Sequence, residues 1–162
     1  MAIFEEKDQA ALLGACESDN EFIPIWLMMR LGMHPSDVSQ ARQKFKFEGN
    51  WLMWKRAKNQ KPRRELISRD IMPRLKRWLE RGRKNSRVAY FQLVRRIGAR
   101  GGHPEYSPMT LRHTYCLQEL RGFVHQKRPP VDFIALVAQR MGCSREVVMQ
   151  NYIDLTQWET VR

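Results

Sequence analysis

The chain has 162 residues, about the length of one average domain, and its 29 Lys and Arg against 17 Asp and Glu give a formal net charge of +12. Hydrophobic residues make up 43% of the chain, which excludes a disordered basic tail and suffices for one sizeable core. The longest near-apolar run, Phe22 to Met29, is far shorter than a membrane span. The 3 cysteines have no CxxC spacing, so we expect neither a disulfide framework nor a zinc ribbon, and a location in the reducing cytoplasm.

The positive charge is concentrated in one part of the chain. Between Arg74 and Arg100 lie ten basic residues and one acid, Glu80. A solvated helix face usually mixes both signs, so this run favours a nucleic-acid partner over a plain surface. An anionic membrane surface is a weaker alternative, because no predicted helix pairs a basic face with a clean apolar face.

The first half of the chain predicts helices followed by a small sheet. Gly32 suits a helix C-terminus, and Pro35 suits the first turn of a short helix. Alternation around Phe47 and a Glu-Gly-Asn turn then indicate strands. The predicted elements are helices Glu5–Cys16, Phe22–Leu31 and Pro35–Gln40, then strands at Phe45–Phe47, Trp51–Lys55 and Arg64–Ile67, with a turn at Asn59–Pro62.

The second half is predicted to be helical. Asp70 and Ser86 are suitable N-caps, Ser107-Pro108 is a strong helix start, and His125 to Pro130 is a loop. The predicted helices are Asp70–Arg81, Ser86–Ala99, Ser107–Gly122, Val131–Met141 and Ser144–Asp154. The fold class is therefore α+β and mainly helical, with a three-stranded antiparallel sheet inserted after the second helix, in a single domain over residues 1–162.

Four segments in order resemble the motifs of tyrosine recombinases, the phage-type integrases. Each motif alone is weak evidence for the family. The four together, in this order and on the predicted helices, strands and turns that carry them in the family, are specific. They are Met109-Thr110-Leu111-Arg112-His113-Thr114, similar to the His-x-x-Arg box; Gly32 to Val38, similar to the first arginine box; Lys58 to Leu66, similar to the lysine-bearing β-turn; and Gly142-Cys143 with Asn151-Tyr152, similar to the last box and its tyrosine. The resemblance spans Glu5 to Leu155 and implies an integrase-like catalytic domain, with the family's N-terminal core-binding domain absent.

The resemblance implies DNA transesterification. Tyr152 matches the nucleophile that attacks a backbone phosphate, forms a 3′-phosphotyrosyl bond and frees a 5′-hydroxyl. Arg112 matches an arginine that forks onto two phosphate oxygens, and Lys58 matches the lysine that protonates the leaving oxygen. The covalent bond keeps the energy of the ester, so no cofactor and no metal is expected.

Three family positions carry other residues. His34 stands in place of the first arginine, Met109 in place of the first histidine, and Cys143 in place of the last histidine or tryptophan. His34 and Cys143 remain catalytic candidates, and a bound phosphate is expected to raise the pKa of His34. Arg30, one helical turn earlier, could lend a guanidinium to the same region. A Gly-Met-His first box and a Gly-Cys-Ser last box resemble an archaeal branch of integrases.

The expected partner is double-stranded DNA, so the expected cytoplasmic location is nucleoid-associated. The resemblance implies assembly into a tetramer on DNA, with no membrane partner. The further DNA-binding candidates are Arg30, Lys55, Lys61, Arg63, Arg64, Arg95, Arg96 and His113. For several of the candidate residues a structural or non-specific role is the alternative to a functional one. The basic residues around Lys58 could simply position phosphates, His113 could be a structural histidine, and Tyr152 could be a core residue on the face of Val148 and Leu155.

The sequence is consistent with three hypotheses about the function. The chain is an active strand-exchange enzyme, a catalytically lapsed relative that still binds DNA, or an unrelated basic helical nucleic-acid-binding module. A zinc site formed by the histidines and cysteines is disfavoured, since no ligand pair has the required spacing.

Overall fold

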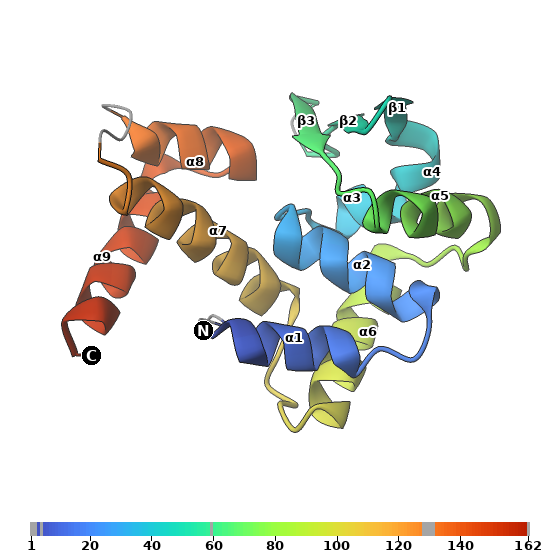
Figure 1. Ribbon diagram of the computed structural model, residues 1–162, viewed down its shortest axis with the longest axis horizontal. Helices are drawn as coiled ribbons and strands as arrows, with labels where there is room; N and C mark the ends of the chain where they lie inside the picture. The colour runs from blue at the N-terminus through green and yellow to red at the C-terminus, as the bar shows by residue number, and fades with distance from the viewer. Residues whose placement is uncertain (1–2, 4, 59, 128–131, 162) are drawn as a thin grey trace.

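The structure is a computed structural model that describes residues 3, 5–58, 60–127 and 132–161, with side chains up to residue 157 (Figure 1). Helices dominate, and a small sheet lies between the fourth and fifth of them. In chain order the described elements are α1 (Glu6–Gly14), α2 (Asp19–Arg30), α3 (Pro35–Ser39), α4 (Ala41–Lys44), β1 (Lys46–Glu48), β2 (Trp51–Lys55), β3 (Pro62–Leu66), α5 (Ile71–Arg81), α6 (Arg87–Arg100), α7 (Pro108–Val124), α8 (Phe133–Met141) and α9 (Arg145–Val161).

The predicted element types are confirmed, with one added helix and several shifted bounds. Helix α2 starts at Asp19, three residues before the predicted Phe22. A second short helix, α4, precedes the sheet, and β3 starts at Pro62 instead of Arg64. Helix α9 continues to Val161, well past the predicted end at Asp154, because no glycine or proline interrupts it. Residues 128–131 of the predicted loop and the following helix start, and residue 59 of the predicted turn, lie outside the described residues.

The helix starts follow local chemistry. The Ser86 hydroxyl accepts a hydrogen bond from the backbone N–H of Ala89 at 3.2 Å, as expected for an N-cap. Pro108 occupies the first turn of α7, where a missing N–H has no cost, and Ser107 and Thr110 form a capping box. Asp70 precedes α5 as predicted, but its side chain makes no capping hydrogen bond.

The sheet is antiparallel with strand order β1-β2-β3. In the pairing of β2 with β3, Trp51 lies opposite Leu66 and Lys55 lies opposite Pro62. Since β2 also pairs with β1, it is the central strand. Leu52 and Trp54 are buried while their neighbours on β2 face outward, which is the two-residue alternation of a strand with one covered face.

Two buried hydrophobic clusters hold the molecule together. The larger one surrounds α2, whose residues Ile23, Ile25 and Leu27 are fully buried, and it extends to the inner face of the sheet. The smaller one joins α7, α8 and α9, which lie together at one end of the molecule (Figure 1). Helix α7 contributes to both clusters and therefore connects them.

A close contact fixes α2 against α7. Gly32 follows α2 with φ +67°, and a Cβ at this position would lie 2.4 Å from a ring carbon of Tyr115 on α7. Only glycine combines this backbone conformation with such an approach. The contact sets the segment after α2, including His34, beside the start of α7.

Candidate functional site

A cavity of about 1160 Å³ is lined by residues from both halves of the chain. Its lining comes from α3, the segment after β2, the starts of α6 and α7, the turn between α8 and α9, and α9 itself. The lining residues are His34, Ser36, Asp37, Gln40, Arg56, Ala57, Lys58, Arg87, Glu105, Ser107, Met109, Thr110, Arg112, His113, Met141, Gly142, Cys143, Ser144, Val147 and Asn151. The cavity thus contains residues from all four motifs.

Asp37 connects the first motif to the segment that carries Lys58. Its carboxylate is buried, with one oxygen accepting from the backbone N–H of Ala57 at 2.8 Å and the other from that of His34 at 3.2 Å. Lys58, the next residue after Ala57, is exposed at the cavity. The Asp37 side chain therefore holds the Lys58 backbone next to the first motif.

His34 is a neutral donor in this arrangement. It is the N-cap of α3, and its Nδ1 accepts a hydrogen bond from the backbone N–H of Ser36 at 3.1 Å. An Nδ1 that accepts carries no proton, so the neutral ring has its proton on Nε2. Burial, and then the charge of Arg112, hold the pKa of His34 below its ordinary value of 6.5.

Arg112 lies on the first turns of α7 and reaches the end of α8. Its Nη2 donates to the carbonyl oxygen of Met141 at 3.1 Å. The last carbonyls of a helix have no partner within the helix, so a guanidinium there stabilises the helix end. Burial lowers the pKa of Arg112 below its ordinary value. Burial also raises the pKa of the Cys143 thiol, and the charges of Arg112 and Arg56 oppose this rise. Cys143 is therefore a thiol at neutral pH, and a weak donor.

Met109 stands at the rim of the cavity with 69% of its surface exposed. Its thioether supplies no proton. His113, one residue after Arg112, also lines the cavity.

Tyr152 does not line the cavity, although Asn151 does. The Tyr152 ring packs edge-on against Phe133 of α8 with ring centroids 5.8 Å apart, and it borders the cluster that contains Val148 and Leu155. The amide of Asn151 donates to the Cys116 sulfur at 3.2 Å and anchors α9 to α7. In this conformation Tyr152 lies on one face of α9, and the neighbouring face of the same helix lines the cavity.

The other basic candidates lie outside the cavity lining. Lys55, Lys61 and Arg64 are exposed on and beside the sheet, and the Arg64 guanidinium stacks 4.2 Å above the Trp51 ring. Arg95 and Arg96 are exposed on α6, and Arg30 is half-buried at the end of α2. Arg96 also lies 3.7 Å from a carboxylate oxygen of Glu21.

Arg63 differs from its neighbours because it is buried. Its guanidinium forms an ion pair with Glu65, donates to the carbonyl oxygen of Arg140 and donates to the Tyr115 hydroxyl at 3.3 Å. It thereby joins β3 to α7 and α8, which is an internal structural role.

Two basic cavity residues were not singled out from the sequence. Arg87, the first residue of α6, belongs to the basic run but to no motif. Arg56 follows β2, and the alternation that buries Leu52 and Trp54 continues to it. That two-residue period is the signal that predicts an inward-facing Arg56.

Within the described part of the chain, no group of three or more His, Cys, Asp or Glu side chains is arranged to hold a metal ion. No described helix has both the length and the apolar run that crossing a bilayer demands.

Comparison with solved structures finds the same fold in two recombinases. XerA recombinase matches with a TM-score of 0.66 and 17% identity over 94% of this chain and 59% of its own. The XerH site-specific recombinase, bound to a palindromic difH substrate in a post-cleavage complex, matches with a TM-score of 0.69 and 16% identity over 91% of this chain and 48% of its own. No protein-family model and no curated protein matches the sequence.

The TM-scores, at identities this low, establish the fold alone. The chain has the mainly helical fold with a small three-stranded antiparallel sheet that tyrosine recombinase catalytic domains possess, as the four motifs predicted. It spans only about half to three-fifths of the length of the two recombinases.

Proposed function

We propose that this chain breaks and rejoins DNA by transesterification through a 3′-phosphotyrosyl intermediate, as part of site-specific recombination or integration. The observation that carries the proposal is the cavity, which gathers His34, Lys58, Arg112 and Cys143 from four segments far apart in the sequence. The recombinase fold and the DNA-bound state of XerH support the same conclusion. The substrate is double-stranded DNA.

In the proposed first step, the scissile phosphate occupies the cavity. Arg112 binds two non-bridging oxygens through its planar fork, and the Nε2–H of His34 donates a further hydrogen bond. Preorganised donors of this kind stabilise the charge that develops on the phosphate in the transition state.

In the proposed second step, the Tyr152 oxygen attacks phosphorus and its proton passes to solvent. The bond between phosphorus and the 5′-oxygen breaks, and the Lys58 ammonium gives a proton to that oxygen. Attack requires α9 to turn or shift, because the Tyr152 ring in the middle of this helix now packs on Phe133. The reverse reaction with a second 5′-hydroxyl rejoins the strand and releases the tyrosine, so no external energy source is needed.

The proposed DNA-binding surface surrounds the cavity mouth. Lys58 and Arg87 are exposed at the cavity, and Lys55, Lys61 and Arg64 extend the positive charge over the sheet. Exposed lysines and arginines contact phosphates without reading sequence, so they position the duplex. Assembly into a tetramer on DNA belongs to the same proposal.

A suicide-substrate assay tests the proposal. Nicked duplexes, drawn from a random pool or from DNA flanking the gene, are incubated with the protein and resolved on a denaturing gel. We expect a covalent protein–DNA band with wild type and with Tyr106→Phe, a buried tyrosine outside the site. Tyr152→Phe is expected to give no band, because it lacks the nucleophilic oxygen.

A band of equal yield from Tyr152→Phe contradicts the assignment of the nucleophile. A gel shift of the same DNA without any covalent band favours a DNA-binding relative that has lost catalysis. The exposed Met109 at the rim is the feature of the cavity that fits this second outcome.

A further inference from the structure

Arg56 is a buried cation whose two terminal nitrogens, Nη1 and Nη2, find no acceptor within the part of the chain that the structure describes. Only 6% of its surface is exposed, and it lines the cavity. Arg63, the other arginine that is buried among the described residues, lies outside the cavity and has an ion pair and two further acceptors. The contrast singles out Arg56, because buried polar groups normally have a partner.

The surroundings of Arg56 compensate only part of its charge. Arg63 and Arg112 are close enough to disfavour its charged form, and the one nearby carboxylate, Asp37, already accepts from two backbone N–H groups. Burial, followed by the charge of Arg63, lowers the pKa of Arg56 to about 10. The side chain therefore stays protonated at neutral pH, in a position that is unfavourable for folding.

Arg56 and Arg112 meet at the same turn. A Cβ on Gly142 would lie 2.1 Å from Nη1 of Arg56, so the guanidinium lies directly against this glycine. Arg112 donates to the carbonyl oxygen of the preceding residue, Met141. The turn between α8 and α9 thus covers two guanidinium groups that come from different sides of the cavity.

We propose that Arg56 is a second phosphate-binding residue and supplies the guanidinium that His34 does not. The inference rests on the proposed function, since the anion it identifies is a backbone phosphate of DNA in the cavity. A phosphate between Arg56 and Arg112 gives Arg56 the acceptor it lacks and gives Arg112, which has only the Met141 carbonyl oxygen as a hydrogen-bond acceptor among the described residues, an anionic one. Because Gly142 covers Nη1, binding requires the turn at residues 142–144 to move outward, while Arg112 can keep its bond to Met141 and bind phosphate through its other donors.

The first test uses inorganic phosphate and thermal unfolding, without DNA. At about ten times its Kd, phosphate is expected to raise the Tm of the wild-type protein by about 4 °C. Arg56→Met is expected to lose most of this rise while its Tm without phosphate is unchanged or higher, because the substitution removes an unpaired buried charge.

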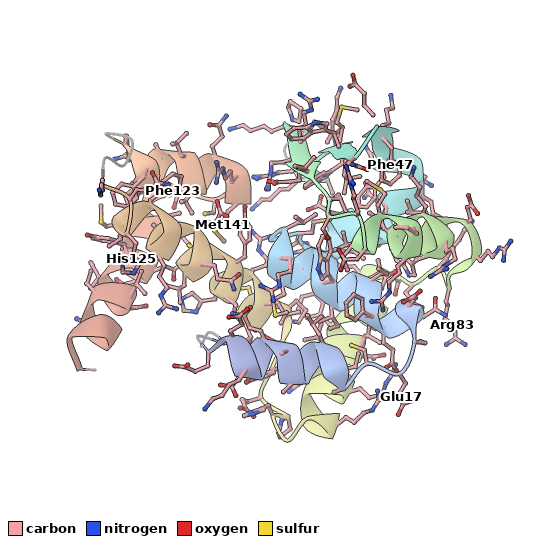
Figure 2. All side chains as sticks on the ribbon, viewed as in Figure 1. Glu17, Phe47, Arg83, Phe123, His125 and Met141 are labelled. Atoms are coloured by element: carbon pink, nitrogen blue, oxygen red, sulfur yellow. The ribbon has the colours of Figure 1, made fainter. Side chains whose placement is uncertain are left out.

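Arg83→Met is the matched control, since Arg83 is exposed and lies well away from Met141 (Figure 2). It is expected to keep the full rise, including any general effect of phosphate as a salt. No rise in the wild type, or an equal rise in Arg56→Met, overturns the inference. A lower Tm for Arg56→Met with the phosphate response intact identifies a structural residue and overturns it as well.

The second test separates the inference from the proposed function. In the suicide-substrate assay, Arg56→Met is expected to lower the rate of adduct formation by about 10². A wild-type adduct that forms equally fast in Arg56→Met overturns the role of Arg56 and leaves the proposed function standing. If the wild type forms no adduct, the proposed function fails, and the phosphate response alone decides whether Arg56 binds an anion.

Discussion

Arg112 and Met141 are joined by a hydrogen bond of 3.1 Å that links the start of α7 to the end of α8. The side chain that is proposed to bind phosphate thus also stabilises the helix end beside the site. Since a guanidinium has five N–H donors, it can keep one helix carbonyl while other donors face the cavity. The double role predicts that changes at Arg112 affect both stability and chemistry.

We expect Arg112→Ala to lower the free energy of unfolding by about 1–2 kcal/mol, because a charged donor to a helix carbonyl is lost. Adduct formation is expected to fall by at least about 10². Arg112→Lys keeps the charge without the planar fork and is expected to restore stability better than activity. Urea denaturation and the adduct assay measure the two effects, and unchanged cleavage in Arg112→Ala excludes the proposed role.

Gly142→Ala tests the contact between the turn and Arg56. The residue has φ +68°, and an added Cβ would meet Nη1 of Arg56 at 2.1 Å, so we expect a loss of at least about 2 kcal/mol of stability. Gly122→Ala is the control, because Gly122 lies in helix α7 with open space around it and is expected to gain about 0.5–1 kcal/mol.

The double variant of Gly142→Ala with Arg56→Met isolates the contact. If Arg56 fills the space in front of Gly142, the two changes are expected to couple, and the double variant loses less than the sum of the single losses. Strict additivity in chemical denaturation would show that the two residues do not interact.

Two adjacent arginines on β3 are expected to behave differently. Arg63→Ala removes a buried guanidinium from Glu65, Arg140 and Tyr115 and is expected to cost about 3 kcal/mol of stability. Arg64→Ala removes an exposed stack on Trp51 and is expected to cost less than about 1 kcal/mol. Equal losses in thermal or urea unfolding would refute this division between a structural and a surface residue.

Stability is expected to depend on pH through His34. Its folded-state pKa is lowered, chiefly by burial and then by Arg112, so the unfolded chain binds the proton more tightly. The free energy of unfolding is therefore expected to be highest above the ordinary value of 6.5 and to decrease as pH falls through the window below it.

The measurement is the difference between wild type and His34→Asn over that window, since asparagine keeps an N-cap acceptor and does not titrate. Arg112, Asp37, Arg87 and Lys58 are the charged groups around the ring, and they remain in both proteins. Parallel stability curves for the two proteins would contradict the expectation. The rise of the His34 pKa on phosphate binding stays a prediction, testable by titrating the ring with DNA present.

DNA affinity is expected to fall steeply between about 50 and 200 mM salt, because the proposed contacts release counterions from phosphates. Lys58→Ala and Arg64→Ala are expected to reduce the logarithmic salt slope by about one each, whereas the distant Arg83→Met changes it less. Gel-shift titrations at several salt concentrations give the slope. A flat response argues against a DNA partner.

Local sequence determined the type and order of the elements. The strand Trp51–Lys55 has the predicted bounds, and Ser86 and Ser107 begin helices where capping chemistry places them. These features depend on neighbouring residues, so periodicity and capping preferences suffice to predict them. The motif residues His34, Lys58, Arg112 and Cys143 could likewise be selected from the sequence, and the fold brings them to one cavity.

Only the tertiary structure decided which side chains face the cavity. Arg63 and Arg64 are adjacent on β3, yet one is buried between elements and the other is exposed. Tyr152 rests on Phe133 beside the cavity, and Arg56 lies unpaired behind Gly142, because both depend on how the turn between α8 and α9 packs against distant segments. Such contacts join residues far apart in the chain, and no local pattern specifies them.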